Sequence, residues 1–120
     1  MIIYHNPRCS KSREAMELLK ENNCDFEVRE YLKVPPTEKE LKDLIKKLGC
    51  KPFDIVRQKE ELFINKYRSK KISGPQWIKI LAANPILIER PIVITNTEAI
   101  VGRPPVLVLE LAKKNKNTKT

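Results

Sequence analysis

The sequence is poor in the residues that build disulfide frameworks and metal centres. Its only cysteines are Cys9, Cys24 and Cys50, and it has one histidine, His5. An odd number of cysteines at unrelated spacings argues against a disulfide framework and is typical of a reducing compartment. One histidine and no pair of cysteines at finger-like spacing give no basis for a metal site. We therefore expect no bound metal and no bound cofactor.

Long hydrophobic runs are also missing. No apolar stretch approaches the ~20 residues that a membrane helix needs. The N-terminus has no basic segment followed by a long apolar stretch, so no export signal is visible. Hydrophobic residues make up 41% of the 120 residues, which favours a folded domain over disorder. We expect a single domain over residues 1–120, a monomer in the cytoplasm without a membrane partner.

Acidic residues are too few to balance the basic ones, and the formal net charge is +9. Such an excess raises nucleic-acid or membrane-surface binding as possibilities. Part of it is local, because residues 113–120 hold four lysines and no acid. We interpret residues from about 115 to 120 as a flexible basic tail. The rest of the excess fits solubility or attraction of a small anion, and we expect no nucleic-acid partner.

The segment His5–Arg13 carries the strongest chemical signal. It follows a strand-like opening, Met1–Tyr4, and leads into a helix-like segment that starts near Ser10. Cys9 therefore lies at a strand-to-helix junction, where free backbone N–H groups and the helix dipole stabilise a thiolate. Such sites can lower a cysteine pKa from ~8.5 to roughly 3.5–7.5. The same donors and the basic neighbours would attract an oxyanion, so the segment predicts a nucleophilic cysteine inside an anion pocket.

Hydrophobic periodicity predicts an α/β fold. A strand, a helix and a strand in about 30 residues form a right-handed βαβ unit. A mostly helical block, a β-hairpin and a last helix follow this unit. The whole order is that of a thioredoxin-like domain with inserted helices, although periodicity alone also allows other α/β sandwiches. The fold predicted is βαβ, a helical insertion, and ββα, with a mixed sheet flanked by helices. The strands expected are Met1–Tyr4, Asp25–Tyr31, Pro91–Thr95 and Glu98–Gly102, and the helices are about Ser10–Asn22, most of 37–83, and about Pro105–Lys114.

Four motifs in order resemble those of the glutaredoxin-coupled arsenate reductase family over nearly the whole chain. The first is His-x₃-Cys-x₃-Arg within His5–Arg13. The others are Asp54–Arg57, Asn84–Val93 and Gly102–Pro105. This resemblance implies a thioredoxin-like arsenate reductase.

The resemblance also assigns roles to residues. It implies that Cys9 is the nucleophile, that His5 helps to lower the Cys9 pKa, and that the Arg90–Pro91 peptide is cis. It places the oxyanion-binding guanidinium groups at Arg57, Arg90 and Arg103. Arg13 is either a further anion ligand or only a residue near the helix cap, and both interpretations stay open.

Arsenate is a tetrahedral oxyanion that planar guanidinium groups bind bidentately, and a thiolate can displace one of its oxygens. The resemblance implies that glutathione, as co-substrate, then attacks the adduct and that glutaredoxin resolves the mixed disulfide. No second cysteine near Cys9 is then needed, in agreement with Ser12 at the position that a Cys-x-x-Cys pair would occupy. Cys24 and Cys50 lack a comparable motif, and we expect structural roles for them.

Three alternatives are weaker. A low-molecular-weight tyrosine phosphatase needs Cys-x₅-Arg, but the residue six after Cys9 is Ala15. Spx-type regulators share this layout and bind RNA polymerase, yet they typically carry the Cys-x-x-Cys switch from which Ser12 departs. A thiol reductase of another oxyanion or of a disulfide also fits, because Lys11 stands where the best-known arsenate reductases have small uncharged residues.

Overall fold

The structure is a computed structural model that describes the backbone of residues 1–118 and the side chains of residues 1–114. It divides into two compact units, one of Met1–Val34 with Arg90–Thr120 and one of Pro35–Glu89. The side chains of the basic tail expected at about 115–120 lie outside the described residues. No helix in the described part of the chain is long and apolar enough to cross a membrane.

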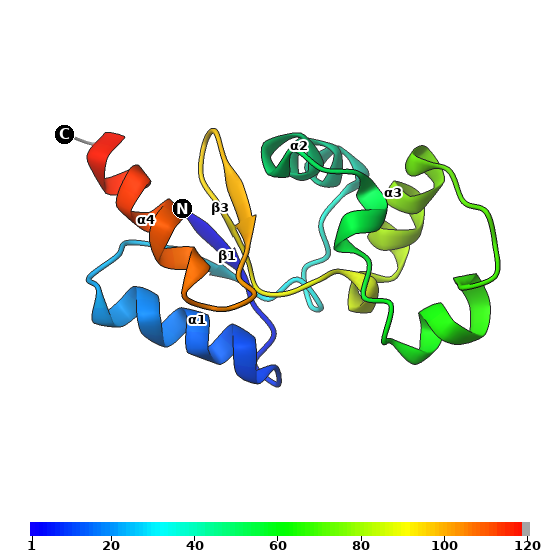
Figure 1. The fold of residues 1–120 in the computed structure, drawn as a ribbon, viewed down its shortest axis with the longest axis horizontal. Coiled ribbons are helices and arrows are strands. Elements are labelled where there is room, and N and C mark those ends of the chain that lie inside the picture. Colours follow the sequence, from blue (N-terminus) through cyan, green and yellow to red (C-terminus); the bar gives the residue numbers. More distant parts are fainter. Residues whose placement is uncertain (119–120) are drawn as a thin grey trace. The chain divides into compact units, whose positions relative to one another are not determined.

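The first unit contains a mixed four-stranded sheet, as predicted (Figure 1). The strand order is β2-β1-β3-β4, in which β1 is parallel to β2 and antiparallel to β3, and β3 is antiparallel to β4. A parallel pair needs a crossover, which helix α1 supplies. The strands are shorter than predicted: β1 is Ile2–Tyr4, β2 is Glu27–Arg29, β3 is Ile92–Ile94 and β4 is Ala99–Val101.

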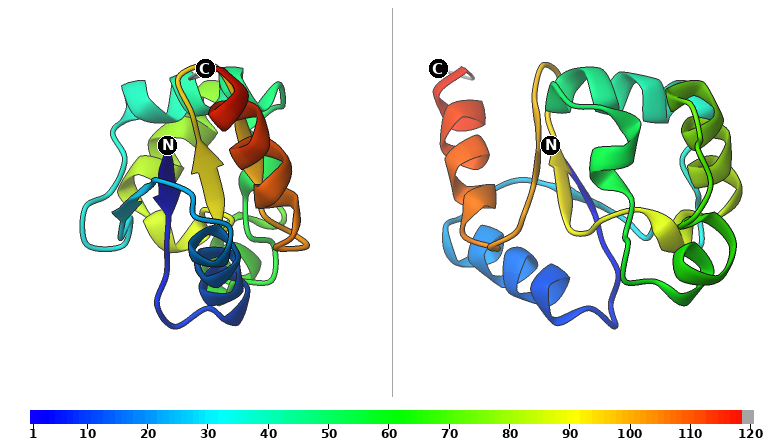
Figure 2. Two further views of the ribbon diagram at one scale, coloured as in Figure 1. Left: turned by 90° about the vertical axis from the view of Figure 1, so that its left-hand side faces the viewer. Right: turned by 45° about the vertical axis from the view of Figure 1, so that its right-hand side comes forward.

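Helices α1 (Ser10–Glu21) and α4 (Leu107–Thr118) cover one face of this sheet (Figure 2). Ile3 and Val93 are partners across β1 and β3, and both are fully buried beneath the helices. Each such side chain contributes roughly 1.5–3 kcal/mol by its burial. The buried residues of this core are Ile3, Ala15, Leu19, Val93, Val108, Leu111 and Ala112.

Close packing at the start of α4 requires a glycine. A Cβ on Gly102 would lie 2.8 Å from Val108 Cγ1 and 2.9 Å from Pro91 Cγ, closer than real Cβ atoms come. The Gly102 N–H donates to the Pro91 carbonyl oxygen at 2.8 Å, which joins the loop after β4 to the start of β3.

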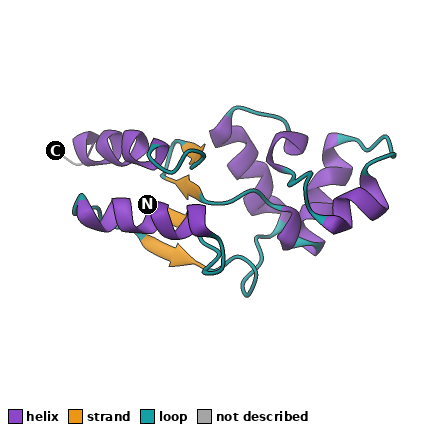
Figure 3. Cartoon of the chain, turned by 60° about the horizontal axis from the view of Figure 1, so that its bottom comes forward, coloured by secondary structure: helices purple, strands orange, loops and turns teal. Residues whose placement is uncertain are grey.

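The second unit is helical (Figure 3), and its two longest helices each begin with a capping box. Thr37 pairs with Glu40 at the start of α2 (Glu38–Leu48), and Ser73 pairs with Gln76 at the start of α3 (Gly74–Ala83). Both boxes satisfy backbone N–H groups that a helix start leaves unpaired. Shorter helical turns at Pro52–Ile55, Phe63–Tyr67 and Pro85–Leu87 complete the unit.

Candidate functional site

Cys9 is the N-cap residue of α1, as its position in the sequence predicted. It is a free, half-buried thiol with extended backbone angles, φ −92° and ψ 121°. Burial raises the pKa of Cys9, but hydrogen bonds from the backbone N–H groups of Ser12 and Lys11, with the hydrogen bond and positive charge of Arg90, outweigh it. The pKa of Cys9 is therefore lowered, which favours the reactive thiolate.

The Ser12 hydroxyl holds the loop before Cys9 in place. Ser12 is fully buried on the inner face of α1, and its Oγ lies 2.6 Å from His5 Nδ1. The same oxygen accepts the Asn6 N–H at 3.1 Å. The Asn6 carbonyl in turn accepts the Cys9 N–H at 3.0 Å. Ser12 thus ties strand β1, the loop and the first turn of α1 together around the thiol.

This hydroxyl links His5 to the loop that precedes Cys9. Its side chain is buried, and burial lowers the pKa of His5, with Lys20 and Arg13 adding to the effect and Glu30 opposing it. The lowered pKa favours the neutral imidazole, which adds no positive charge beside the thiolate. The role that the resemblance implies for His5, lowering the Cys9 pKa, stays a prediction that would act by positioning Ser12.

Arg90 carries a buried guanidinium, and two of its three nitrogens lack hydrogen-bond partners among the described residues. The residue is 8% exposed, and its Nε and Nη1 atoms have no partner among the described residues. Burying a charged group without such bonds is costly, by several kcal/mol for an unpaired ion. An anion beside Cys9 would supply the missing acceptors.

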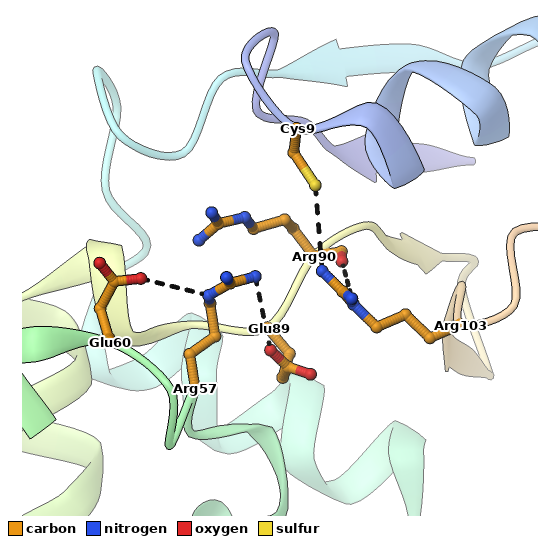
Figure 4. Close-up of polar contacts among 6 residues, drawn as sticks. All are labelled: Cys9, Arg57, Glu60, Glu89, Arg90 and Arg103. Atoms are coloured by element: carbon orange, nitrogen blue, oxygen red, sulfur yellow. Dashed lines mark hydrogen bonds and ion pairs between the residues drawn. The ribbon is translucent and has the colours of Figure 1, made fainter. Parts of the chain in front are cut away.

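Arg103 approaches the same thiol from the loop after β4. Its Nη2 lies 3.9 Å from Cys9 Sγ, and its Nε donates to the Arg90 carbonyl oxygen at 2.9 Å (Figure 4). The Arg90–Pro91 peptide is cis, which confirms the prediction, and the Arg103–Pro104 peptide is cis as well. The structure therefore brings together three of the predicted site residues, Cys9, Arg90 and Arg103.

Arg57 lies in the second unit, where two carboxylates hold its half-buried side chain. Its Nε is 3.4 Å from Glu60 Oε2 and its Nη1 is 3.8 Å from Glu89 Oε1 (Figure 4). The pairing keeps the planar guanidinium in a defined orientation. Its expected contribution to the anion site of Cys9 stays a prediction.

Arg13 lies on the exposed side of α1, and its backbone N–H donates to the Cys9 carbonyl at 3.0 Å. Its side chain lines a surface groove with Glu14 and Glu17. This position fits a residue near the helix cap, and a role in anion binding stays a prediction.

The other two cysteines have different surroundings. Both are free and half-buried. Cys24 packs against the core of the first unit, and burial together with Asp54 raises the pKa of Cys50. The pKa values of Cys9 and Cys50 are therefore shifted in opposite directions, because Cys9 receives helix N–H groups and a guanidinium.

Sequence reasoning missed the positioning role of Ser12. A signal was available, because Ser12 lies in line with Ala15 and Leu19 on the buried face of the helix. A polar residue on an apolar stripe is informative, since a buried hydroxyl needs a partner. Asn22 does not continue this buried face, because it is exposed at the C-terminus of α1, where its Nδ2 donates to the Leu18 carbonyl at 2.8 Å.

The fold and site define a thioredoxin-like domain with an activated cysteine at the N-terminus of its first helix. Residues 4–111 match the ArsC family, and the chain belongs to that family.

Three similar proteins illustrate its membership. The uncharacterized protein YfgD of Escherichia coli K12 is 47% identical over 111 residues, covering 91% of this chain and 93% of that protein. An arsenate reductase of Neisseria meningitidis serogroup B is 43% identical over 108 residues, covering 85% and 89%. The solved structure of an arsenate reductase from Vibrio cholerae is 42% identical, with a TM-score of 0.86 over 91% of this chain and 94% of that one.

Proposed function

We propose that this protein reduces arsenate to arsenite in the cytoplasm, as a monomer that takes its electrons from glutathione and glutaredoxin. The observation that carries the proposal is the buried Arg90 guanidinium next to an activated thiol, since its Nε and Nη1 have no partner in the part of the chain that the structure describes. A tetrahedral oxyanion is the ligand that such a planar donor binds best. Membership of the ArsC family and the names of the similar arsenate reductases support arsenate as that oxyanion.

The first step is nucleophilic. The Cys9 thiolate attacks arsenic(V), an S–As bond forms, and one arsenate oxygen leaves as water after protonation. Arg90 and Arg103 stabilise the charge on the remaining oxygens, and the N–H groups at the start of α1 keep the thiolate available before attack. His5 and Ser12 hold the loop in the required geometry.

The second step transfers the electrons. A glutathione thiolate attacks the Cys9 sulfur, an S–S bond forms and the S–As bond breaks. The electron pair of that bond stays on arsenic, which becomes arsenic(III) and leaves as arsenite. A glutaredoxin thiolate then displaces Cys9 from the mixed disulfide and regenerates its thiol. The two thiols oxidised per arsenate supply the two electrons that arsenic gains.

The test is arsenate-dependent oxidation of NADPH, coupled through glutathione reductase, glutathione and glutaredoxin. Turnover should require all components and should vanish in Cys9→Ser, while Cys24→Ser and Cys50→Ser retain it. Full turnover without glutaredoxin or glutathione would overturn the donor assignment. An active Cys9→Ser variant would overturn the mechanism, and no turnover with any thiol donor would overturn arsenate as substrate.

A further inference from the structure

The positive charge of this chain is concentrated in two stretches. From Leu62 to Ile88 there are five basic residues and no acidic one, and from Leu111 to Thr120 there are four and none. In the rest of the chain fifteen basic residues match fifteen acidic ones. The net charge of +9 is therefore local, and five units of it belong to the helical second unit.

A groove of about 410 Å³ collects much of the first stretch. It lies between the loop that follows Tyr67 and the outer side of α3. Its floor is apolar, since Ile72 and Ile80 are half-buried there. Exposed lysines form its rim, and none of them pairs with an acid among the described side chains. We call the basic groove the site lined by Tyr67, Lys70, Lys71, Ile72, Lys79 and Ile80.

We propose that the basic groove binds an acidic, amphipathic segment of a partner protein. Lysine ammonium groups around an apolar floor complement a peptide whose glutamates or aspartates flank a large aliphatic side chain. The aliphatic side chain fills the floor between Ile72 and Ile80, and the carboxylates meet the ammonium groups of the rim. The carboxylates of the peptide would also supply acidic partners for the rim lysines, which pair with no acid among the described side chains.

Two features disfavour nucleic acid as the occupant. Single-stranded nucleic acid uses exposed aromatic faces on which bases stack. The ring of Tyr67 is buried, with Trp77 at a centroid distance of 5.7 Å and Lys66 Nζ 5.5 Å from the ring centroid. The rim is also built from lysine, whereas bidentate recognition of phosphate favours arginine.

The test is fluorescence anisotropy with a labelled peptide of about ten residues in which pairs of glutamates alternate with leucines. The full-length protein should bind it at low salt and release it progressively as NaCl rises, because exposed charges are screened. Lys70→Glu, Lys71→Glu and Lys79→Glu combined should weaken binding at least about tenfold. Replacing the leucines of the peptide by serine should weaken binding at least about threefold.

A matched control reverses the charge of three lysines elsewhere in the same unit. Lys39, Lys42 and Lys46 are exposed on α2 and do not line the basic groove. Their combined change to glutamate alters the net charge equally and should leave most of the binding. An equal loss in this control would overturn the proposal, because non-specific charge would then explain the affinity.

Two further measurements keep the result decisive. Circular dichroism verifies that each variant is folded, and the triple lysine-to-glutamine variant replaces the reversal if that variant unfolds. A single-stranded oligonucleotide and anionic vesicles of mixed phosphatidylserine and phosphatidylcholine serve as competing probes. If the oligonucleotide or the vesicles bind more tightly than the peptide, and the rim lysine-to-glutamate variant loses that binding, the groove is assigned to nucleic acid or to membranes instead. Absence of peptide binding would overturn the proposal.

Discussion

Replacing Arg90 by methionine should lower activity and raise the stability of the ligand-free protein. Methionine keeps much of the side-chain volume but removes the buried charge. Arg90 is 8% exposed, and two of its guanidinium nitrogens have no partner among the side chains of residues 1–114 or the described backbone, so the free protein bears an uncompensated desolvation cost. Relief of that cost should raise the free energy of unfolding by about 1–3 kcal/mol.

Activity should change in the opposite direction. Loss of one preorganised oxyanion donor typically costs about 2.7–4 kcal/mol of transition-state stabilisation, or roughly 10²–10³ in kcat/KM. Coupled turnover of arsenate measures the loss in kcat/KM, and thermal unfolding with and without arsenate measures the stability. Arsenate should raise the melting temperature of the original protein, and Arg90→Met should abolish most of this rise.

The matched control is Arg68→Met, which removes an exposed arginine and should change neither quantity appreciably. A less stable Arg90→Met variant that keeps its arsenate-induced shift would refute the reasoning, since Arg90 would then be a structural residue. The Cys9 pKa should also rise in Arg90→Met, because the Arg90 hydrogen bond and charge lower it in the original protein.

Three further predictions follow from the described contacts. Iodoacetamide near neutral pH should alkylate Cys9 fastest and Cys50 more slowly, because their pKa values are shifted in opposite directions; equal rates by peptide mapping would contradict this. The folded-state pKa of His5 is lowered, so below about pH 6.5 the unfolded state binds more protons at His5 than the folded state does. The free energy of unfolding should therefore fall as the pH drops below this value. Denaturant titrations of His5→Gln at several pH values should show a smaller dependence of that free energy on pH. Gly102→Ala should destabilise by about 1–3 kcal/mol through the clash of its Cβ, whereas Gly74→Ala, whose nearest contact would be 3.7 Å, should be tolerated in the same titrations.

Local signals in the sequence were enough for the elements that position the site. Cys9 at the strand-to-helix junction and the β-hairpin depend on neighbours only a few residues apart, and both were predicted. The short extent of β2, Glu27–Arg29, was not predicted, because alternation continues along the chain after pairing with β1 ends. Where a ladder stops depends on the partner strand, and residue spacing does not encode it.

The site itself was only partly predictable. The family motifs indicated Arg90 and Arg103, which lie far from Cys9 in sequence, but no local pattern shows whether a guanidinium has partners in the fold. Two carboxylates hold Arg57, whereas two nitrogens of Arg90 have no partner within the described part of the chain. The bond between Ser12 and His5 likewise depends on packing at sub-ångström precision, which composition and periodicity do not determine.

The hydrogen bond from Arg103 Nε to the Arg90 carbonyl oxygen anchors Arg103 through the backbone of residue 90, independently of the Arg90 side chain. The acceptor is a main-chain oxygen, so any side chain at position 90 presents the same atom to Arg103 Nε. Arg103 therefore stays anchored when the Arg90 side chain is replaced. A double-mutant cycle on the two arginines would consequently measure their cooperation through a shared anion, with little contribution from one residue displacing the other.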